Sequence, residues 1–168
     1  MVFRKWWAAA VTLVLLSGGL QAQMAHVSIE NAYVRGLPPS QPNTAAFFTV
    51  RNPHDVPVQI MAGRSDAAER LEIHGHQHRD GMMSMQREDT ITVPAGGEFR
   101  FAPGGYHLML INLTKPLNDG DQLNFELNTL SGETIEVAAP VISVLKPAPL
   151  GATSSTSTAT HTEHTGMH

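Results

Sequence analysis

Alternation of apolar and polar positions is the main pattern of the chain between residues 26 and 141. In "QLNFELN", Leu123, Phe125 and Leu127 point to one side of an extended chain, and the polar residues between them point to the other. Many short strands with regular turn signals predict a single all-β domain, an antiparallel sandwich or barrel. Comparable runs, rich in β-branched and aromatic residues and separated by Pro, Gly and Asn, predict strands within 26–36, 44–52, 56–63, 69–75, 82–88, 90–113 and 121–141.

Both ends of the chain depart from this pattern. Arg4 and Lys5 precede an apolar run and then small residues, which is the pattern of a secretory signal over residues 1–22 with cleavage after Ala22. The apolar run is shorter than the roughly 20 residues that a spanning helix needs, so we expect no stable membrane insertion after cleavage. An uncleaved anchor helix is the alternative.

The C-terminal end changes composition instead. From Lys146 onward the chain is rich in Ser, Thr, Pro and His and poor in apolar residues, so it cannot bury enough surface to order itself. We therefore expect a folded domain over residues 23–146 and a disordered tail over residues 147–168.

Composition narrows the classes of function. A chain of 168 residues fits one domain. Its formal net charge is −4 and it has no basic patch interleaved with aromatics, which argues against nucleic acid as a partner. It contains no cysteine, so lipid attachment to a cysteine after the apolar run, disulfides and thiolate metal ligands are all excluded.

Histidine and methionine are concentrated in one short stretch, "LEIHGHQHRDGMMSMQ". His74 ends a strand whose Leu71 and Ile73 alternate toward the core, and Met83 and Met85 share a face of the next strand. We expect the intervening "HGHQHRDGMMSM" to form a flexible loop near the surface, because it contains two glycines. Met82 on its own is better explained as core filling.

A second His/Met pair lies in "PGGYHLMLINL". Alternation places Leu108 and Leu110 on the core side, so His107 and Met109 point the other way. If the two segments lie side by side, a site of two nitrogens and two sulfurs can form. The residues of that site are His74, Met85, His107 and Met109.

Such a set of ligands is chemically selective. Thioether sulfur is soft and neutral, so it binds Cu(I) well and Zn(II), Ca(II) or Mg(II) poorly. It needs no deprotonation and forms no disulfide, which suits an oxidising compartment. From the pattern alone, ordinary packing of the methionines and histidines remains open as the other explanation.

The spacing of these residues also resembles a known family. His74, ten residues, Met85, twenty-one residues and then His107-Leu108-Met109 are similar to the copper-ligand motif of the periplasmic copper chaperones called PCuAC. The phrases "ENAYVRGLPPS", "NTAAFFTVRN", "ERLEIH" and "VPAGGEFRFAPGGYHLMLINLTKPLNDGD" resemble the same family, so the likeness extends from about residue 27 to 144.

The resemblance implies a function. A PCuAC-like protein would have a cupredoxin-like β-sandwich fold, would be periplasmic and would not be an enzyme. It would bind Cu(I) through His74, Met85, His107 and Met109. It would donate copper to the dinuclear copper centre of cytochrome c oxidase subunit II, directly or with a Sco-like thioredoxin-fold protein. Many relatives have a methionine where this chain has His76; His76, with His78 and Met83 nearby, is therefore an accessory candidate that would favour Cu(II) as well.

The pattern bears on three other functions. A blue-copper electron carrier requires a cysteine thiolate, which the chain lacks. A cupin-like metal enzyme would want a carboxylate after three or four intervening residues beyond its His-x-His pair, and Met82 and Met83 stand at those positions instead. Copper storage or resistance without a dedicated acceptor cannot be separated from delivery by sequence.

The tail supplies a last candidate site. Its imidazoles and terminal carboxylate suit Cu(II), and a mobile linker could carry a captured ion to the body. An inert, solvated terminus is the alternative. The residues concerned are His161, His164, Met167 and His168.

Overall fold

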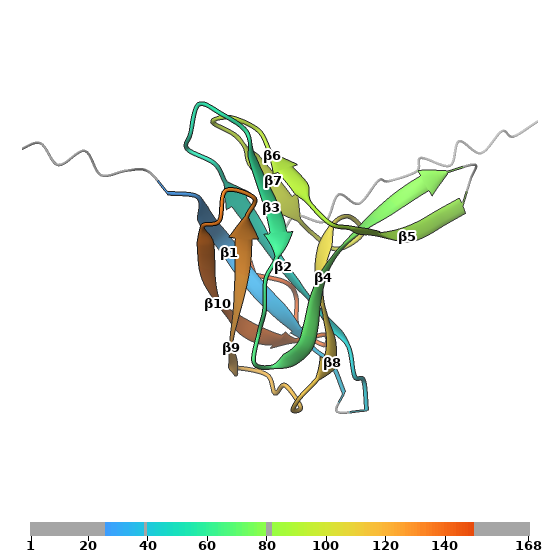
Figure 1. The fold of residues 1–168 in the computed structure, drawn as a ribbon. Coiled ribbons are helices and arrows are strands. Elements are labelled where there is room, and N and C mark those ends of the chain that lie inside the picture. The colour runs from blue at the N-terminus through green and yellow to red at the C-terminus, as the bar shows by residue number, and fades with distance from the viewer. Residues whose placement is uncertain (1–25, 39, 80–81, 150–168) are drawn as a thin grey trace, which may run out of the picture.

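The computed structural model describes residues 26–38, 40–79 and 82–149, and within these it describes no side chains for 77–79, 82 and 83. All regular structure in this part of the chain is β, as the alternation predicted (Figure 1). No helix in the described ranges is long and apolar enough to cross a membrane. The strands are β1 (Ser28–Gly36), β2 (Thr44–Arg51), β3 (Val58–Ala62), β4 (Ala68–Arg79), β5 (Met82–Glu88), β6 (Ile91–Val93), β7 (Glu98–Phe101), β8 (His107–Leu113), β9 (Gln122–Thr129) and β10 (Thr134–Ser143).

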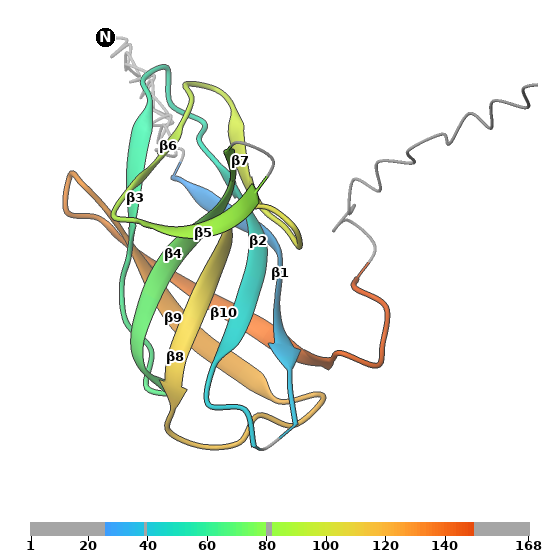
Figure 2. The same cartoon turned by 90° about the vertical axis from the view of Figure 1, so that its right-hand side faces the viewer.

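The strands follow one another around a curved sheet in the order β5-β4-β8-β2-β1-β10-β9-β3-β6, with β7 also paired to β2. Figure 2 shows the sheet curving around the interior, with its end strands β5 and β6 not paired to each other. The pairs are antiparallel except β1 and β10, which run parallel with Val34 opposite Val141. This one parallel pair differs from the expected wholly antiparallel arrangement. It arises because β10 pairs with β9 as far as Pro140 and then continues alongside β1.

The core lies between the two layers and is filled by the alternating apolar positions. Leu123, Phe125 and Leu127 are all buried there, which confirms the period-two prediction for β9. Phe48 of β2 stacks on its ladder partner Phe101 of β7, with ring centroids 4.4 Å apart. It also reaches the other layer, where the ring of Phe125 on β9 lies 5.6 Å away. Burial of such large rings stabilises a fold that has no disulfide.

The β4–β5 hairpin corrects one expectation. The strand does not end at His74: β4 pairs with β8 as far as His74 and continues to Arg79, and β5 folds back along it. Figure 1 shows this hairpin extending away from the sandwich. The expected flexible loop is therefore largely paired strand. Gly75 has a packing role, because a Cβ there would lie 2.8 Å from Cε1 of the Tyr106 ring.

Candidate metal centre

The outer face of β4 and β8 brings two histidines together. His74 lies directly opposite His107 in the ladder, and their ring centroids are 5.9 Å apart. The next pair, Ile73 and Leu108, points into the core and is 1% and 0% exposed. Because side chains alternate along a strand, this buried pair fixes both imidazoles on the opposite face. The two segments therefore lie side by side, which was the condition for a shared site.

A third imidazole joins them. His76 lies two residues further along β4, and its ring centroid is 5.4 Å from that of His107. Nδ1 of His76 and Nδ1 of His107 are each 3.1 Å from the carbonyl oxygen of Gly105. A carbonyl oxygen only accepts hydrogen bonds, so a neutral ring in this position carries its proton on Nδ1. The Nε2 lone pairs of His76 and His107 are thereby left available to a metal ion.

Glu72 contacts the remaining histidine and was missed in the sequence. Its Oε2 is 2.8 Å from Nε2 of His74, and its Oε1 is 3.1 Å from Nε of Arg70 and 3.6 Å from Nη1 of Arg87. The hydrogen bond with His74, more than the arginines, holds the pKa of Glu72 below its usual range. The signal was available: Glu72 is two residues before His74 on an alternating strand and so shares its face.

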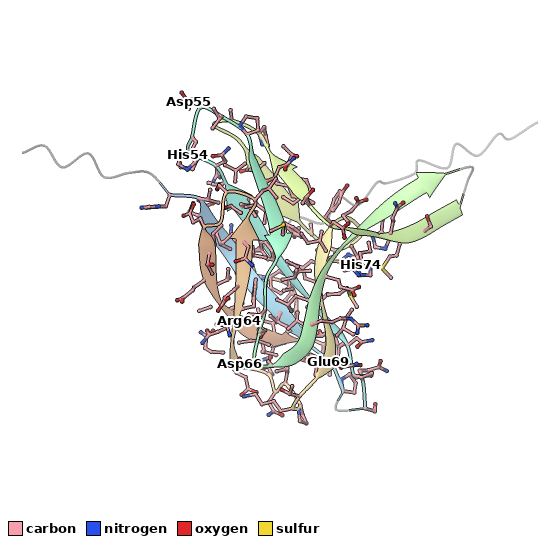
Figure 3. All side chains as sticks on the ribbon, viewed as in Figure 1. His54, Asp55, Arg64, Asp66, Glu69 and His74 are labelled. Carbon is pink, nitrogen blue, oxygen red and sulfur yellow. The ribbon has the colours of Figure 1, made fainter. Side chains whose placement is uncertain are left out.

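The two methionines come from strands on either side of β4. Met109 follows His107 by two residues on β8, opposite Glu72 in the ladder, and is partly buried. Met85 on β5 is opposite His76, and it is 58% exposed. Figure 3 shows His74 where the β4–β5 hairpin leaves the sandwich. The structure thus brings His74 and His107 together directly, with one thioether position on each neighbouring strand.

His107 is the most enclosed of the three imidazoles. It is 6% exposed, and the ring of Phe47 lies 6.4 Å away, centroid to centroid. Burial lowers the pKa of His107, an effect that the hydrogen bond to Gly105 partly offsets. The neutral form, which is the form that binds metals, is therefore favoured at neutral pH.

Comparison with known proteins places the chain in a family. The family described as "Putative lipoprotein LpqE-like" matches residues 27–141. The chain belongs to the LpqE-like family. A relative in Leifsonia xyli subsp. xyli, named "Putative lipoprotein Lxx21020", is 33% identical over 116 residues, which cover 68% of this chain and 69% of the relative.

Solved structures resemble this LpqE-like chain as well. The Cu(I) form of DR1885 from Deinococcus radiodurans is 32% identical, with a TM-score of 0.61, and the match covers 74% of this chain and 84% of that one. The copper-bound PCuAC domain of PmoF2 is 21% identical, with a TM-score of 0.58, and the match covers 71% and 99%. The second likeness shows a shared fold, so the cupredoxin-like β architecture expected from the sequence is confirmed.

Other candidate residues are not placed by the structure. Among the described residues, no set of three or more His, Cys, Asp or Glu side chains is arranged as a metal site. The candidate site differs from such a set because half of its proposed ligands are methionines. The backbone of β5 pairs Met83 with His78, but the side chains of both lie outside the described ones. The expected signal segment, 1–22, also lies outside the described residues. So do the tail candidates His161, His164, Met167 and His168.

Proposed function

We propose that this LpqE-like protein is a Cu(I) chaperone of the cell envelope. The observation that carries the proposal is the pairing of His74 with His107 on one sheet face, with Met109 and Met85 on the strands to either side. Two imidazoles with a free lone pair each and two neutral thioethers are a donor set that favours Cu(I) over hard divalent ions. Copper is here the cargo, and no residue is assigned a catalytic role.

The comparisons support this assignment. DR1885, of which a Cu(I) form has been solved, is a relative at 32% identity over most of both chains. The N-terminal signal pattern and the naming of a relative as a lipoprotein both fit a protein that works outside the cytoplasm. We propose the periplasm as its compartment. A metal site without cysteine suits this oxidising compartment, because it has no thiolate ligand that could be lost to a disulfide.

Delivery is the role that the position of the ligands favours. His107 is buried and Met109 partly so, whereas Met85 is more than half exposed on the projecting hairpin. An acceptor can therefore approach copper from the Met85 side while the histidines still hold it, so that no free ion is released. We propose that the acceptor is the dinuclear copper centre of cytochrome c oxidase subunit II, reached directly or through a Sco-like protein.

A transfer assay tests this function. The Cu(I)-loaded protein is mixed anaerobically with the soluble copper domain of oxidase subunit II, with and without a Sco-like protein, and the copper content of each is measured after separation. Delivery predicts that copper moves to the acceptor faster than it moves to a chelator of equal affinity. Retention of Cu(I) in both mixtures would instead favour copper storage or resistance, the alternative left open by the sequence.

A further inference from the structure

The two oxygens of Glu72 have separate contacts. Oε2 lies 2.8 Å from Nε2 of His74, whereas both arginine contacts, from Arg70 and Arg87, are made to Oε1. The side chain of Glu72 is 13% exposed, and those of the arginines are 56% and 62% exposed. The carboxylate is therefore oriented by the arginines on one side and directed at the imidazole on the other.

This arrangement is more than a surface ion pair. Exposed arginine–carboxylate pairs contribute little free energy of their own, because water and salt screen them. A hydrogen bond between a carboxylate and an imidazole that is itself only 20% exposed is screened less by water. Of the three contacts of Glu72, the one to His74 therefore gains most strength from the limited exposure of the carboxylate, because both of its partners are shielded from water.

The chemistry of the contact selects one nitrogen. An ionised carboxylate only accepts hydrogen bonds, so Nε2 of His74 must carry the proton that lies between them. A neutral His74 then has its lone pair on Nδ1. His107 has the opposite arrangement, because the carbonyl oxygen of Gly105 accepts a hydrogen bond from its Nδ1–H and the lone pair is then on Nε2.

We propose that Glu72 is a positioning residue that holds His74 in the Nε2–H tautomer, so that His74 binds copper through Nδ1 and His107 binds it through Nε2. The inference rests on the proposed function and adds the atoms of ligation to it. Histidine ligands in metalloproteins commonly donate their other N–H to a carboxylate or carbonyl, which fixes the ring and raises its basicity. Here Glu72 and the Gly105 carbonyl fill that role for two different nitrogens.

Nitrogen NMR of the intact mature protein tests the proposal. The protein is labelled with ¹⁵N-histidine, and long-range ¹H–¹⁵N correlation spectra are recorded without metal and with one equivalent of Cu(I), at one pH above the histidine range. In the metal-free parent, His74 is expected to show a protonated Nε2 and an unprotonated Nδ1. On addition of Cu(I), the large shift is expected at Nδ1 of His74 and at Nε2 of His107.

Two variants separate positioning from general charge. Glu72→Gln should weaken Cu(I) binding by about tenfold or more, the usual cost of losing an outer carboxylate partner, and should allow His74 to populate both tautomers. Glu69→Gln is the matched control, since Glu69 lies on the same strand (Figure 3) and contacts Asn112 through Oε2. It should leave both the affinity and the tautomer of His74 as in the parent.

The outcomes distinguish this inference from the proposed function. Cu(I) binding in the parent with the large shift at Nε2 of His74 would overturn the role of Glu72 and leave the chaperone intact. So would a Glu72→Gln variant with the parent's affinity and tautomer. A folded parent that takes up no Cu(I) would overturn the proposed function, and an unprotonated Nε2 in its metal-free spectrum would overturn the inference separately. Should Glu72→Gln fail to fold, the parent spectra alone decide between the two nitrogens.

Discussion

At the scale of single residues, burial separates the proposed ligands into a fixed and an accessible part. His107 is 6% exposed and its pKa is lowered by that burial, whereas Met85 is 58% exposed on the hairpin. A buried ligand holds its geometry and keeps protons away, and an exposed one can be exchanged for a ligand from another protein. In the proposed function, retention of the metal thus belongs to His107 and its release to Met85.

The buried histidine predicts a pH dependence of folding. Because the pKa of His107 is lower in the folded state, the unfolded chain binds more protons, so stability falls as pH drops below the reference value of about 6.5. Urea unfolding of the metal-free protein at about pH 7.5 and about pH 5.5 should show this loss, and His107→Gln should reduce the difference between the two pH values. An unchanged pH dependence in His107→Gln would contradict the assignment.

The exposed methionine predicts a loss of affinity without a loss of stability. Met85→Ala should weaken Cu(I) binding by at least roughly 10- to 100-fold. That is the loss typical when a residue that only hydrogen-bonds a metal ligand is removed, and Met85 is proposed to bind the metal itself. It should change the free energy of unfolding by less than about 0.5 kcal/mol, as surface substitutions do. Leu130→Ala is the control, because Leu130 is 62% exposed away from the site. Parent-like affinity in Met85→Ala, measured by chelator competition, would remove Met85 from the set.

At the scale of elements, the β4–β5 hairpin adds His76 and Met85 to the neighbouring pair His74 and His107. β8 begins at His107, opposite His74, and β4 continues past this point. The continuing part of β4 carries His76 and is the strand with which β5 pairs. The ring of Tyr106 packs against Gly75 at the point where the hairpin leaves the body, and also lies edge-on to Phe99, 4.9 Å away. Gly75 therefore sets the direction of the hairpin through packing.

Substitution of this glycine should disturb the hairpin. In Gly75→Ala the new Cβ would lie 2.8 Å from Cε1 of Tyr106, a ring that Phe99 restrains, so we expect a destabilisation of about 1–3 kcal/mol. Gly105→Ala is the control, since its Cβ would be 3.6 Å from the Ala102 oxygen, an ordinary contact, and should change stability by less than about 1 kcal/mol. Denaturant unfolding compares them. Equal stability of Gly75→Ala and the parent would contradict this role for Tyr106.

The sequence predicted the elements better than their connections. Alternation identified the buried faces of β8 and β9, because period-two burial is a local signal. It left the adjacency of His74 and His107 as a condition, which the β4–β8 ladder meets. The hairpin was read as a loop, since Gly75 signals flexibility in sequence, whereas the β4–β5 ladder pairs this segment and Tyr106 packs against Gly75. The parallel β1–β10 pair depends on two strands that are far apart in the chain. No local pattern encodes such a contact.

At the scale of the whole molecule, the segment that follows β10 is held against the sandwich at Lys146. Nη1 of Arg35 donates to the carbonyl oxygen of Lys146 over 3.1 Å, and the Lys146 ammonium pairs with Asp119. β10 ends at Ser143, just before these contacts. Lys146 is thus a natural point at which to remove the remaining chain without cutting into a strand.

Truncation at this point tests the expected tail site. The full-length mature protein should bind a second copper as Cu(II), and the chain ending at Lys146 should lose most of that binding, because the imidazoles of the tail are absent. Cu(I) binding by the body should be nearly unchanged. Calorimetric titration with each ion measures both. If the truncated chain still takes up two Cu(II) ions as tightly as before, the tail is not the second site, and His76 and His78 become the better candidates.

The most direct test of the account is an anaerobic Cu(I) titration against a competing chelator, run on the mature protein and on Met109→Ala. Met109 is the partly buried thioether beside His107, and its removal leaves the core residues Leu108 and Leu110 in place. If Met109 is a ligand, we expect one Cu(I) per chain in the parent and a marked loss of affinity in a Met109→Ala variant of unchanged fold. Equal affinity of the two proteins for Cu(I) would contradict it.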